Sequence, residues 1–369
     1  MNAPSPFWQL LFAPEAATLP ALAVPMKLLT KRGQPLLLLP APPHLAGRGL
    51  ELYPAQTMRG RLLRTLAGWA LQARLPFGVT SVPVALTPDD AFIRWLAGLA
   101  GLAPGIMPQF AALAGNPNSP GQRFILMLFD PAGTPVAVVK VGVTEAARRL
   151  IAQEAQFLET VPITATGIPK LRGTFANSKI RALALDFFPG HSPRASEEQA
   201  LPQVLGNWLR PQTPIVVADT RSWRELRATC ANHPVFTSLA VSLRHLSCAG
   251  ALVHGDFTPW NIRVSPSGDW NVVDWERGEL NGVPALDWFH YQIQKSILVQ
   301  HQPVAALVDA AERLLSGNEF KAYAQAAGLR GQERSLLLFY LLYQAEVIRP
   351  AEGLAATRAL LNRLAARWG

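Results

Sequence analysis

The sequence has few cysteines and few charged residues for its length. Of its 369 residues only Cys230 and Cys248 are cysteines, and charged residues make up 16%. Two cysteines cannot build the disulfide framework that holds small secreted domains together. The opening residues, MNAPSPFWQL, lack the basic start and long apolar segment of a secretory signal peptide. We therefore expect a cytoplasmic protein.

Long apolar segments without helix breakers are also missing. The longest stretch without a charged residue, 95–122, is interrupted by Pro104, Pro108, Pro117 and Pro120, so we expect no transmembrane helix there. Hydrophobic residues make up 49% of the chain, and 32 residues are prolines. This composition excludes a disordered chain and indicates a globular protein of two or three domains with many stiff loops.

Acidic residues are scarce in the first half of the chain. The net charge is +9, and residues 1–189 carry 17 basic and 9 acidic residues, whereas residues 190–369 carry 17 and 16. A basic balance alone is compatible with nucleic acid, anionic lipid or a phosphorylated ligand. Because the sequence has neither zinc-ligand spacing nor an RNA-binding pattern of aromatic and basic residues, we expect no nucleic-acid partner.

Residues 1–105 are predicted to form an N-terminal accessory region. Residues 22–39 indicate two short strands around a Lys31-Arg32-Gly33 turn. Residues 56–74 then show helical spacing of apolar residues, with Met58, Leu62, Leu66 and Leu71 on one side. Two interpretations of this amphipathic helix stay open: a surface helix that covers a core, or a helix that lies on a membrane surface.

The rest of the chain divides into a β-rich part, 106–188, and a mainly helical part, 189–369. The β-rich part is predicted to run strand (122–130), strand (134–142), helix (145–161), strand (171–177), strand (179–188). In the helical part, we predict helices at 222–231, 235–248, 304–315, 331–347 and 353–367, with short β-like pieces within 250–280.

The strongest chemical signal is a pair of motifs in this helical part. The first is HGDFTPWN, residues 254–261, and the second is VVDWE, residues 272–276. Phosphoryl transfer needs positioning and charge neutralisation around the γ-phosphate more than covalent chemistry. Asp256 would accept the proton of the attacking hydroxyl, while Asn261 and Asp274 would hold Mg²⁺ through oxygen ligands.

These motifs resemble those of the aminoglycoside phosphotransferase and choline kinase family, over residues 106–369. The resemblance implies a protein-kinase-like α+β fold of two lobes, a small β-rich one and a mainly helical one, with ATP and Mg²⁺ as cofactors. It also implies a lysine on a strand that binds the α- and β-phosphates, and a glutamate on the next helix that pairs with it. Lys140 in VAVVKVG matches the lysine, and Glu154 matches the glutamate, although Glu145 and Glu159 lie on the same predicted helix.

Two further nucleotide contacts follow from position in such a fold. The loop over the phosphates would be 115–121, with Gly115 and the side chains of Asn118 and Ser119 as ligands. This loop departs from a GxGxxG pattern and its two prolines remove two N–H donors, so an ordinary hairpin turn stays an equal alternative. Asp186 and Phe188 fall where the hinge between the lobes would offer backbone groups to adenine.

Three neighbouring polar residues are expected to have supporting roles. His254, between an apolar segment and a glycine, is predicted to fix the catalytic loop rather than to act as a base. Glu276 either assists the metal site or orients the loop. Asp287 in ALDWFHY is predicted to cap a helix or to hydrogen-bond the catalytic loop.

The predicted function is transfer of the ATP γ-phosphate to a hydroxyl of a small molecule. A protein kinase is disfavoured because His-Gly-Asp replaces His-Arg-Asp and Asp274 is followed by Trp-Glu instead of Phe-Gly. The nearly neutral helical part also disfavours a polycationic aminoglycoside as substrate. The alternative is a catalytically silent kinase-like scaffold, associated with a membrane surface through the basic helix at 56–74.

Overall fold

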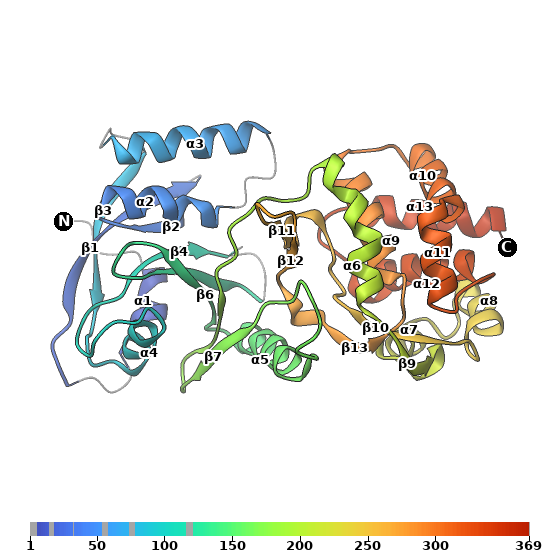
Figure 1. Ribbon diagram of the computed structural model, residues 1–369, viewed down its shortest axis with the longest axis horizontal. Helices are drawn as coiled ribbons and strands as arrows, with labels where there is room; N and C mark the ends of the chain where they lie inside the picture. Colours follow the sequence, from blue (N-terminus) through green and yellow to red (C-terminus); the bar gives the residue numbers. More distant parts are fainter. Residues whose placement is uncertain are drawn as a thin grey trace. The chain divides into compact units, whose positions relative to one another are not determined.

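The computed structural model describes residues 6–14, 18–31, 33–53, 58–73, 78–115 and 121–368. The chain divides into two compact units. Unit 1 comprises Met1–Glu159 and Pro169–Phe188, and unit 2 comprises Thr160–Ile168 and Pro189–Gly369. Unit 1 contains one large sheet and unit 2 contains two small ones, and Figure 1 labels most of the helices and strands of both.

Unit 1 is organised around one antiparallel sheet of eight strands in the order β3-β1-β2-β4-β5-β6-β8-β7. Its strands are β1 (Leu22–Lys31), β2 (Gln34–Pro40), β3 (Val79–Leu86), β4 (Gln109–Ala114), β5 (Arg123–Phe129), β6 (Pro135–Gly142), β7 (Leu171–Ala176) and β8 (Arg181–Asp186). Its helices are α1 (Pro6–Phe12), α2 (Pro43–Gly49), α3 (Met58–Gln72), α4 (Ala91–Leu99) and α5 (Glu145–Thr160).

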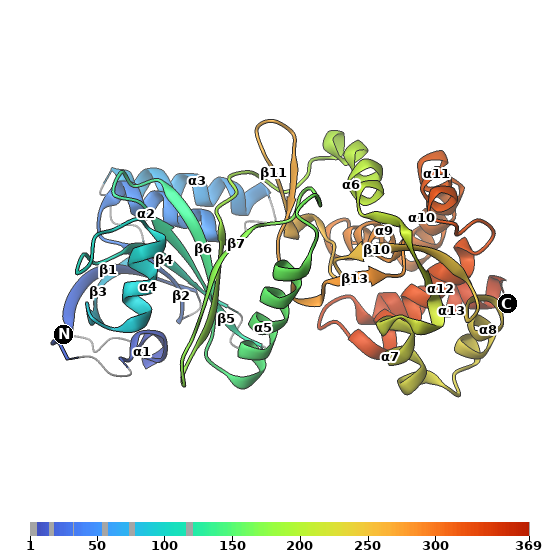
Figure 2. The same cartoon turned by 60° about the horizontal axis from the view of Figure 1, so that its bottom comes forward.

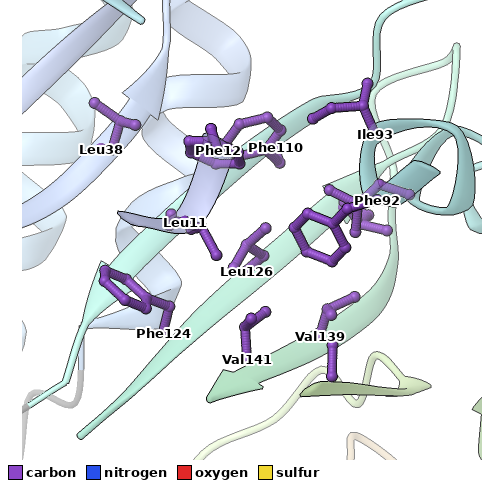
Figure 3. Packing of buried hydrophobic residues seen from close by; sticks show 14 of the residues in the cluster. Leu11, Phe12, Leu38, Phe92, Ile93, Phe110, Phe124, Leu126, Val139 and Val141 are labelled. Carbon is purple, nitrogen blue, oxygen red and sulfur yellow. The ribbon is translucent and has the colours of Figure 1, made fainter. Parts of the chain in front are cut away.

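Both faces of this sheet are covered, because successive strand residues alternate between the faces. One face packs against α1 and α4, and the core between them includes Phe92 of α4 and Phe110, Leu126 and Val139 of the sheet, which Figure 3 shows among their neighbours. The other face packs against α2 and α3. Leu37 and Leu39 of β2 belong to that second core with Met127 of β5, whereas the intervening Leu38 belongs to the first.

The predicted order of strand, strand, helix, strand, strand is confirmed as β5, β6, α5, β7 and β8. The two strands predicted within residues 22–39 are confirmed as β1 and β2. These two strands join the same sheet, because β2 pairs with β4 through Leu37 with Leu113 and Leu38 with Ala112. The compact units therefore have no boundary at residue 105, whereas unit 1 ends at Phe188.

The amphipathic helix predicted at 56–74 is confirmed as α3, and the apolar residues expected on one side divide between the core and the surface. Ala67 and Leu71 are buried against the second core. Leu62 and Leu66, expected on the same side as Leu71, are 61% and 51% exposed. Helix α3 packs against α2, and fewer of its apolar side chains reach the core than the apolar pattern of the sequence suggests.

Unit 2 is mainly helical, with two small sheets. Its helices are α6 (Leu201–Asn207), α7 (Arg221–Cys230), α8 (Pro234–Leu243), α9 (Leu286–Gln294), α10 (Val304–Ser316), α11 (Asn318–Ala326), α12 (Glu333–Tyr343) and α13 (Leu354–Trp368). Its strands are β9 (Leu209–Val216), β10 (Ser247–Val253), β11 (Ile262–Val264), β12 (Trp270–Val272) and β13 (Glu279–Gly282). Helix α12 contacts α8, α9 and α13, and lies among them in Figure 2.

Most of the helices predicted in the C-terminal part are confirmed, but the helix predicted at 235–248 is too long. Helix α8 ends at Leu243, and Ser247–Val253 form strand β10 instead. Its residues pair with β9 on one side and β13 on the other. Tertiary strand pairing overrides the local helical pattern here.

In the part of the chain that the structure describes, no helix is long and apolar enough to cross a lipid bilayer.

Candidate active site

The HGDFTPWN segment forms a loop that begins directly after β10. Its start is held by Asp287, the second residue of α9, whose carboxylate accepts hydrogen bonds from the backbone N–H of His254 at 2.6 Å and of Gly255 at 3.0 Å. Gly255 has a φ of +78°, and a Cβ there would lie 2.9 Å from Cβ of Arg277. Glycine is therefore required at this position. Of the two roles predicted for Asp287, a helix cap or a hydrogen bond to the HGDFTPWN loop, the structure shows the second.

His254 is fully buried and has one hydrogen bond at each ring nitrogen. Its Nδ1 accepts from the backbone N–H of Asp256 at 3.1 Å, and its Nε2 lies 2.8 Å from the carbonyl oxygen of Val273. Because a carbonyl only accepts, Nε2 carries the proton and the ring is neutral. Burial lowers the pKa of His254 to about 4, despite the nearby Asp256. These contacts match the expected role in fixing the loop.

Asp256 has a carboxylate that is held on both oxygens and still 39% exposed. Its Oδ1 lies 3.0 Å from Nε2 of His290 on α9. Its Oδ2 accepts from Nδ2 of Asn261 at 3.0 Å. Burial of the group acts to raise the pKa of Asp256, but the hydrogen bond from His290 and the nearby charge of Arg277 act to lower it, and this pKa lies below its ordinary value. The carboxylate is therefore ionised at neutral pH and able to accept a proton.

Asn261 and Asp274 are brought together by the ladder of β11 and β12. Ile262 pairs with Val272, and the backbone N–H of Val273 donates to the carbonyl oxygen of Asn261 at 2.8 Å. Since Nδ2 of Asn261 is used by Asp256, the side-chain atom left for a cation is Oδ1. Asp274 follows with a left-handed backbone, φ +74°. An amide oxygen and a carboxylate at one end of a ladder fit the preference of Mg²⁺ for oxygen ligands.

In unit 1, Lys140 and Glu154 form a buried ion pair. The Nζ atom of Lys140 lies 2.6 Å from Oε1 and 2.9 Å from Oε2 of Glu154. The two side chains are 5% and 0% exposed. Val139 and Val141 pack into the core beneath α1 and α4, so strand alternation directs Lys140 to the opposite face of the sheet. Glu154, rather than Glu145 or Glu159, is the residue of α5 in this contact.

The predicted phosphate loop is only partly described, since Asn118 and Ser119 lie outside the described residues. Gly115 is at the end of β4, where its N–H donates to the carbonyl oxygen of Arg123 at 3.0 Å. A Cβ at Gly115 would lie 2.4 Å from that oxygen. The close approach of β4 and β5 thus explains the glycine. Phosphate binding by this loop stays a prediction.

The two predicted hinge residues lie at the end of unit 1. Asp186 is the last residue of β8 and pairs with Ala137 of β6, and its carboxylate lies 3.8 Å from Nε of Arg172. Phe188, two residues further on, is half-buried. Adenine binding by their backbone groups also stays a prediction.

Two residues near Asp256 were not predicted from the sequence: His290, which contacts Asp256, and Tyr340, whose hydroxyl lies 3.2 Å from Nδ1 of His290. Asp287 and His290 are three residues apart on α9, so both side chains lie on one side of the helix. One helix therefore holds the backbone of the loop through Asp287 and its carboxylate through His290. The only sequence signal was this Asp-x-x-His spacing in a helical segment after the VVDWE motif.

Two kinds of known proteins are similar to this chain: a sequence family and several solved structures. A sequence model of the phosphotransferase enzyme family (APH) matches residues 43–287. No curated protein matches the chain significantly. Among solved structures, it is similar to a thermostable mutant of the aminoglycoside phosphotransferase APH(4)-Ia in complex with ADP and hygromycin B, with 14% identity, 75% of this chain and 98% of that chain covered and a TM-score of 0.48.

Two other solved structures show similar coverage. A putative aminoglycoside phosphotransferase from Ralstonia eutropha JMP134 is 14% identical, with 75% of this chain and 98% of that chain covered and a TM-score of 0.45. A putative fructosamine-3-kinase from Haemophilus somnus 129PT is 12% identical, with 74% and 96% covered and a TM-score of 0.44. The family match spans the Lys140–Glu154 pair and both motifs of unit 2, and it confirms the expected kinase-like α+β fold. The chain belongs to the phosphotransferase enzyme family.

Proposed function

We propose that the protein transfers the γ-phosphate of ATP to a hydroxyl group of a small molecule, with Asp256 as the general base. The observation that carries this proposal is the state of the Asp256 carboxylate. It is partly exposed, its pKa is held below the ordinary value, and each of its oxygens receives one hydrogen bond. Because each carboxylate oxygen has two lone-pair sites, both can still accept from a substrate hydroxyl.

The transfer itself needs one proton acceptor. Asp256 orients the acceptor O–H and takes its proton while the oxygen forms a bond to the γ-phosphorus. The bond from that phosphorus to the β,γ-bridging oxygen breaks, and ADP leaves with the electron pair. Proton, phosphoryl group and charge are then accounted for by the substrate, ATP and Asp256.

The other predicted residues supply binding. Asn261 Oδ1 and the Asp274 carboxylate would hold Mg²⁺, which neutralises charge on the phosphate oxygens when bound. Lys140 would contact the α- and β-phosphates. Its ammonium group is already held by Glu154 at 2.6 and 2.9 Å, so its position requires no further ordering when the nucleotide binds.

The charge of unit 2 favours a neutral acceptor. Residues 190–369 carry 17 basic and 16 acidic residues, so this part lacks the acidic excess that would attract a polycation. Sugars and amino alcohols of low charge are the acceptor classes to test first.

The test is a screen of the purified protein with Mg·ATP and a panel of hydroxylated metabolites. ADP formation and ³¹P NMR would detect a new phosphate ester. Asp256→Asn is the control, because it keeps the shape of the side chain and removes its charge. A phosphate ester formed equally by wild type and Asp256→Asn would exclude Asp256 as the base.

A further inference from the structure

A chain of hydrogen bonds runs from Asp256 into the core of unit 2. Nε2 of His290 lies 3.0 Å from Oδ1 of Asp256, and Nδ1 of His290 lies 3.2 Å from the hydroxyl of Tyr340. That hydroxyl accepts from Nε2 of Gln294 at 3.5 Å. His290, Gln294 and Tyr340 are 5%, 3% and 2% exposed. Bulk water therefore has little access to these three groups.

The donor and acceptor roles along this chain follow from its two ends. An ionised carboxylate only accepts, so Nε2 of His290 must carry a proton toward Asp256. At the other end, the NH₂ group of Gln294 only donates, so the oxygen of Tyr340 accepts from it. Among the described residues, Nδ1 of His290 is the only acceptor within hydrogen-bond distance of the buried Tyr340 hydroxyl, so the hydroxyl proton is directed to Nδ1. The imidazole is therefore neutral, with its proton on Nε2.

We infer that His290, held in its neutral Nε2–H form by Tyr340, is a positioning residue that orients the Asp256 carboxylate toward the acceptor hydroxyl. This inference rests on the proposed function of Asp256. A neutral donor orients the carboxylate without forming a full ion pair, which a lysine or arginine in the same place would do.

The first test reads the protonation of His290 directly and requires no turnover. Imidazole ¹⁵N NMR of the full-length protein at neutral pH, assigned with His290→Gln, should show one protonated Nε2 and one unprotonated Nδ1. Tyr340→Phe removes the donor to Nδ1 and should move the Nδ1 resonance. Tyr343→Phe is the matched control on the same helix, because the Tyr343 hydroxyl donates to Glu225. An imidazolium ring, or a proton on Nδ1, would overturn the inference.

The second test uses ATP hydrolysis, with water as the acceptor, because the natural acceptor is unidentified. His290→Leu should lower kcat by about 10- to 100-fold, as loss of an orienting partner does at other sites, with KM for ATP unchanged. His290→Gln places an amide N–H near the former Nε2 and should restore most of kcat. Equal kcat in His290→Leu and wild type would overturn the inference. If wild type hydrolyses no ATP, the proposed function is in doubt, while the NMR result still decides the state of His290.

An independent observation in unit 1 concerns the outer side of α3. Large apolar side chains are exposed there, namely Leu62 (61%), Leu63 (61%), Leu66 (51%) and Trp69 (71%). The opposite side of the helix is buried through Ala67 and Leu71. Exposed apolar residues are common singly, but four on one short helix indicate a surface that binds something.

The basic residues in the segment around this surface indicate an anionic partner. The segment 22–74 contains eight lysines and arginines and one acidic residue, and α3 itself has three arginines and no acidic residue. An apolar helix side with an indole ring, in a strongly basic segment, is complementary to a membrane surface that carries anionic headgroups. We propose that α3 binds an anionic lipid surface, with Leu62, Leu66 and Trp69 entering the boundary between headgroups and acyl chains.

Flotation of the full-length protein with vesicles tests this proposal. Wild type should float with vesicles of phosphatidylcholine and phosphatidylserine, float much less with phosphatidylcholine alone, and lose binding in high salt. The double variant Leu66→Glu/Trp69→Glu should lose flotation. Val241→Glu is the matched control, because Val241 on α8 of unit 2 is 85% exposed. Absence of flotation, or self-association of wild type that the double variant abolishes without any lipid binding, would overturn the proposal.

Discussion

The two units hold their buried charges in different ways. In unit 1, Lys140 and Glu154 neutralise one another, and both side chains are almost fully buried. In unit 2, the groups around the HGDFTPWN loop are held mainly by uncharged partners: His254 by backbone groups, Asp287 by two backbone N–H groups, and Asp256 by His290 and Asn261. Unit 1 thus keeps a fixed pair, whereas unit 2 keeps one carboxylate oriented and available to accept a proton.

The largest expected effect comes from changing Asp256, the carboxylate of unit 2 that is available to accept a proton. Asp256→Asn should lower turnover by roughly 10² to 10⁴, or about 3 to 5 kcal/mol of transition-state stabilisation, because it removes the proton acceptor. Affinity for Mg·ATP and the melting temperature should change little. Measuring kcat, nucleotide affinity and melting temperature on one preparation distinguishes this outcome from a loop defect, in which all three would decline together.

Breaking the fixed pair should affect stability instead. Lys140→Ala leaves the Glu154 charge buried without its lysine and should cost about 3 to 5 kcal/mol in the free energy of unfolding, measured with urea. The double variant Lys140→Met/Glu154→Leu should recover most of this loss, because it removes both charges. Nucleotide binding should not recover. If the double variant binds Mg·ATP as wild type does, Lys140 has no role in binding phosphate.

Asp287 and His254 of unit 2 are buried against uncharged partners, so we expect them to change the free energy of unfolding with pH in opposite directions. Burial raises the pKa of Asp287 to about 6, despite its two backbone hydrogen bonds. The contribution of Asp287 to the free energy of unfolding is therefore present at low pH and is lost as the pH rises from about 4 to 6. Burial lowers the pKa of His254 to about 4, so stability is lost as the pH falls from 6.5 to 4. Each effect is about 3 kcal/mol, and the two oppose one another.

In Asp287→Asn only the effect of His254 remains. The free energy of unfolding of this variant should therefore rise by about 3 kcal/mol between pH 4 and 6.5, relative to wild type. Denaturant unfolding across this range checks it, and His254→Gln should show the reverse slope. Parallel curves for wild type and both variants would mean that neither group titrates as its burial predicts.

The smallest expected effect comes from ligand binding. Mg·ATP at one hundred times its dissociation constant should stabilise the protein by about 2.7 kcal/mol, which a thermal-shift titration would detect. Asp274→Ala should remove the dependence of this shift on Mg²⁺, because it removes the charged ligand, while Asn261→Ala should be milder. A shift that needs Mg²⁺ equally in Asp274→Ala would assign the metal to other residues.

The predictions from sequence succeeded where function requires particular residues at fixed spacing. The HGDFTPWN and VVDWE motifs, and a lysine in a strand followed by a glutamate in a helix, were sufficient to predict the family and the kinase-like fold. Local patterns also located the hairpin of β5 and β6 and helix α5, since their boundaries carry turn residues and a helix cap.

They failed where a partner from elsewhere in the fold decides the outcome. Residues 247–248, predicted as the end of a helix, belong to β10 because β9 supplies the pairing strand. Leu62 and Leu66 are exposed, whereas Ala67 and Leu71 of the same helix pack into the second core. In both cases the local pattern allows more than one outcome, and contacts distant in sequence select among them.

By itself the sequence determined the chemistry: which carboxylates, amide and lysine are present, in what order, and hence the family. Only the tertiary structure decided how Asp256 is held. His290 and Tyr340 lie 34 and 84 positions beyond it, and the packing of α9 against α12 brings all three into one chain of hydrogen bonds. Spacing in sequence records short-range geometry, whereas the direction of a buried hydrogen bond depends on side chains that meet only when the helices pack.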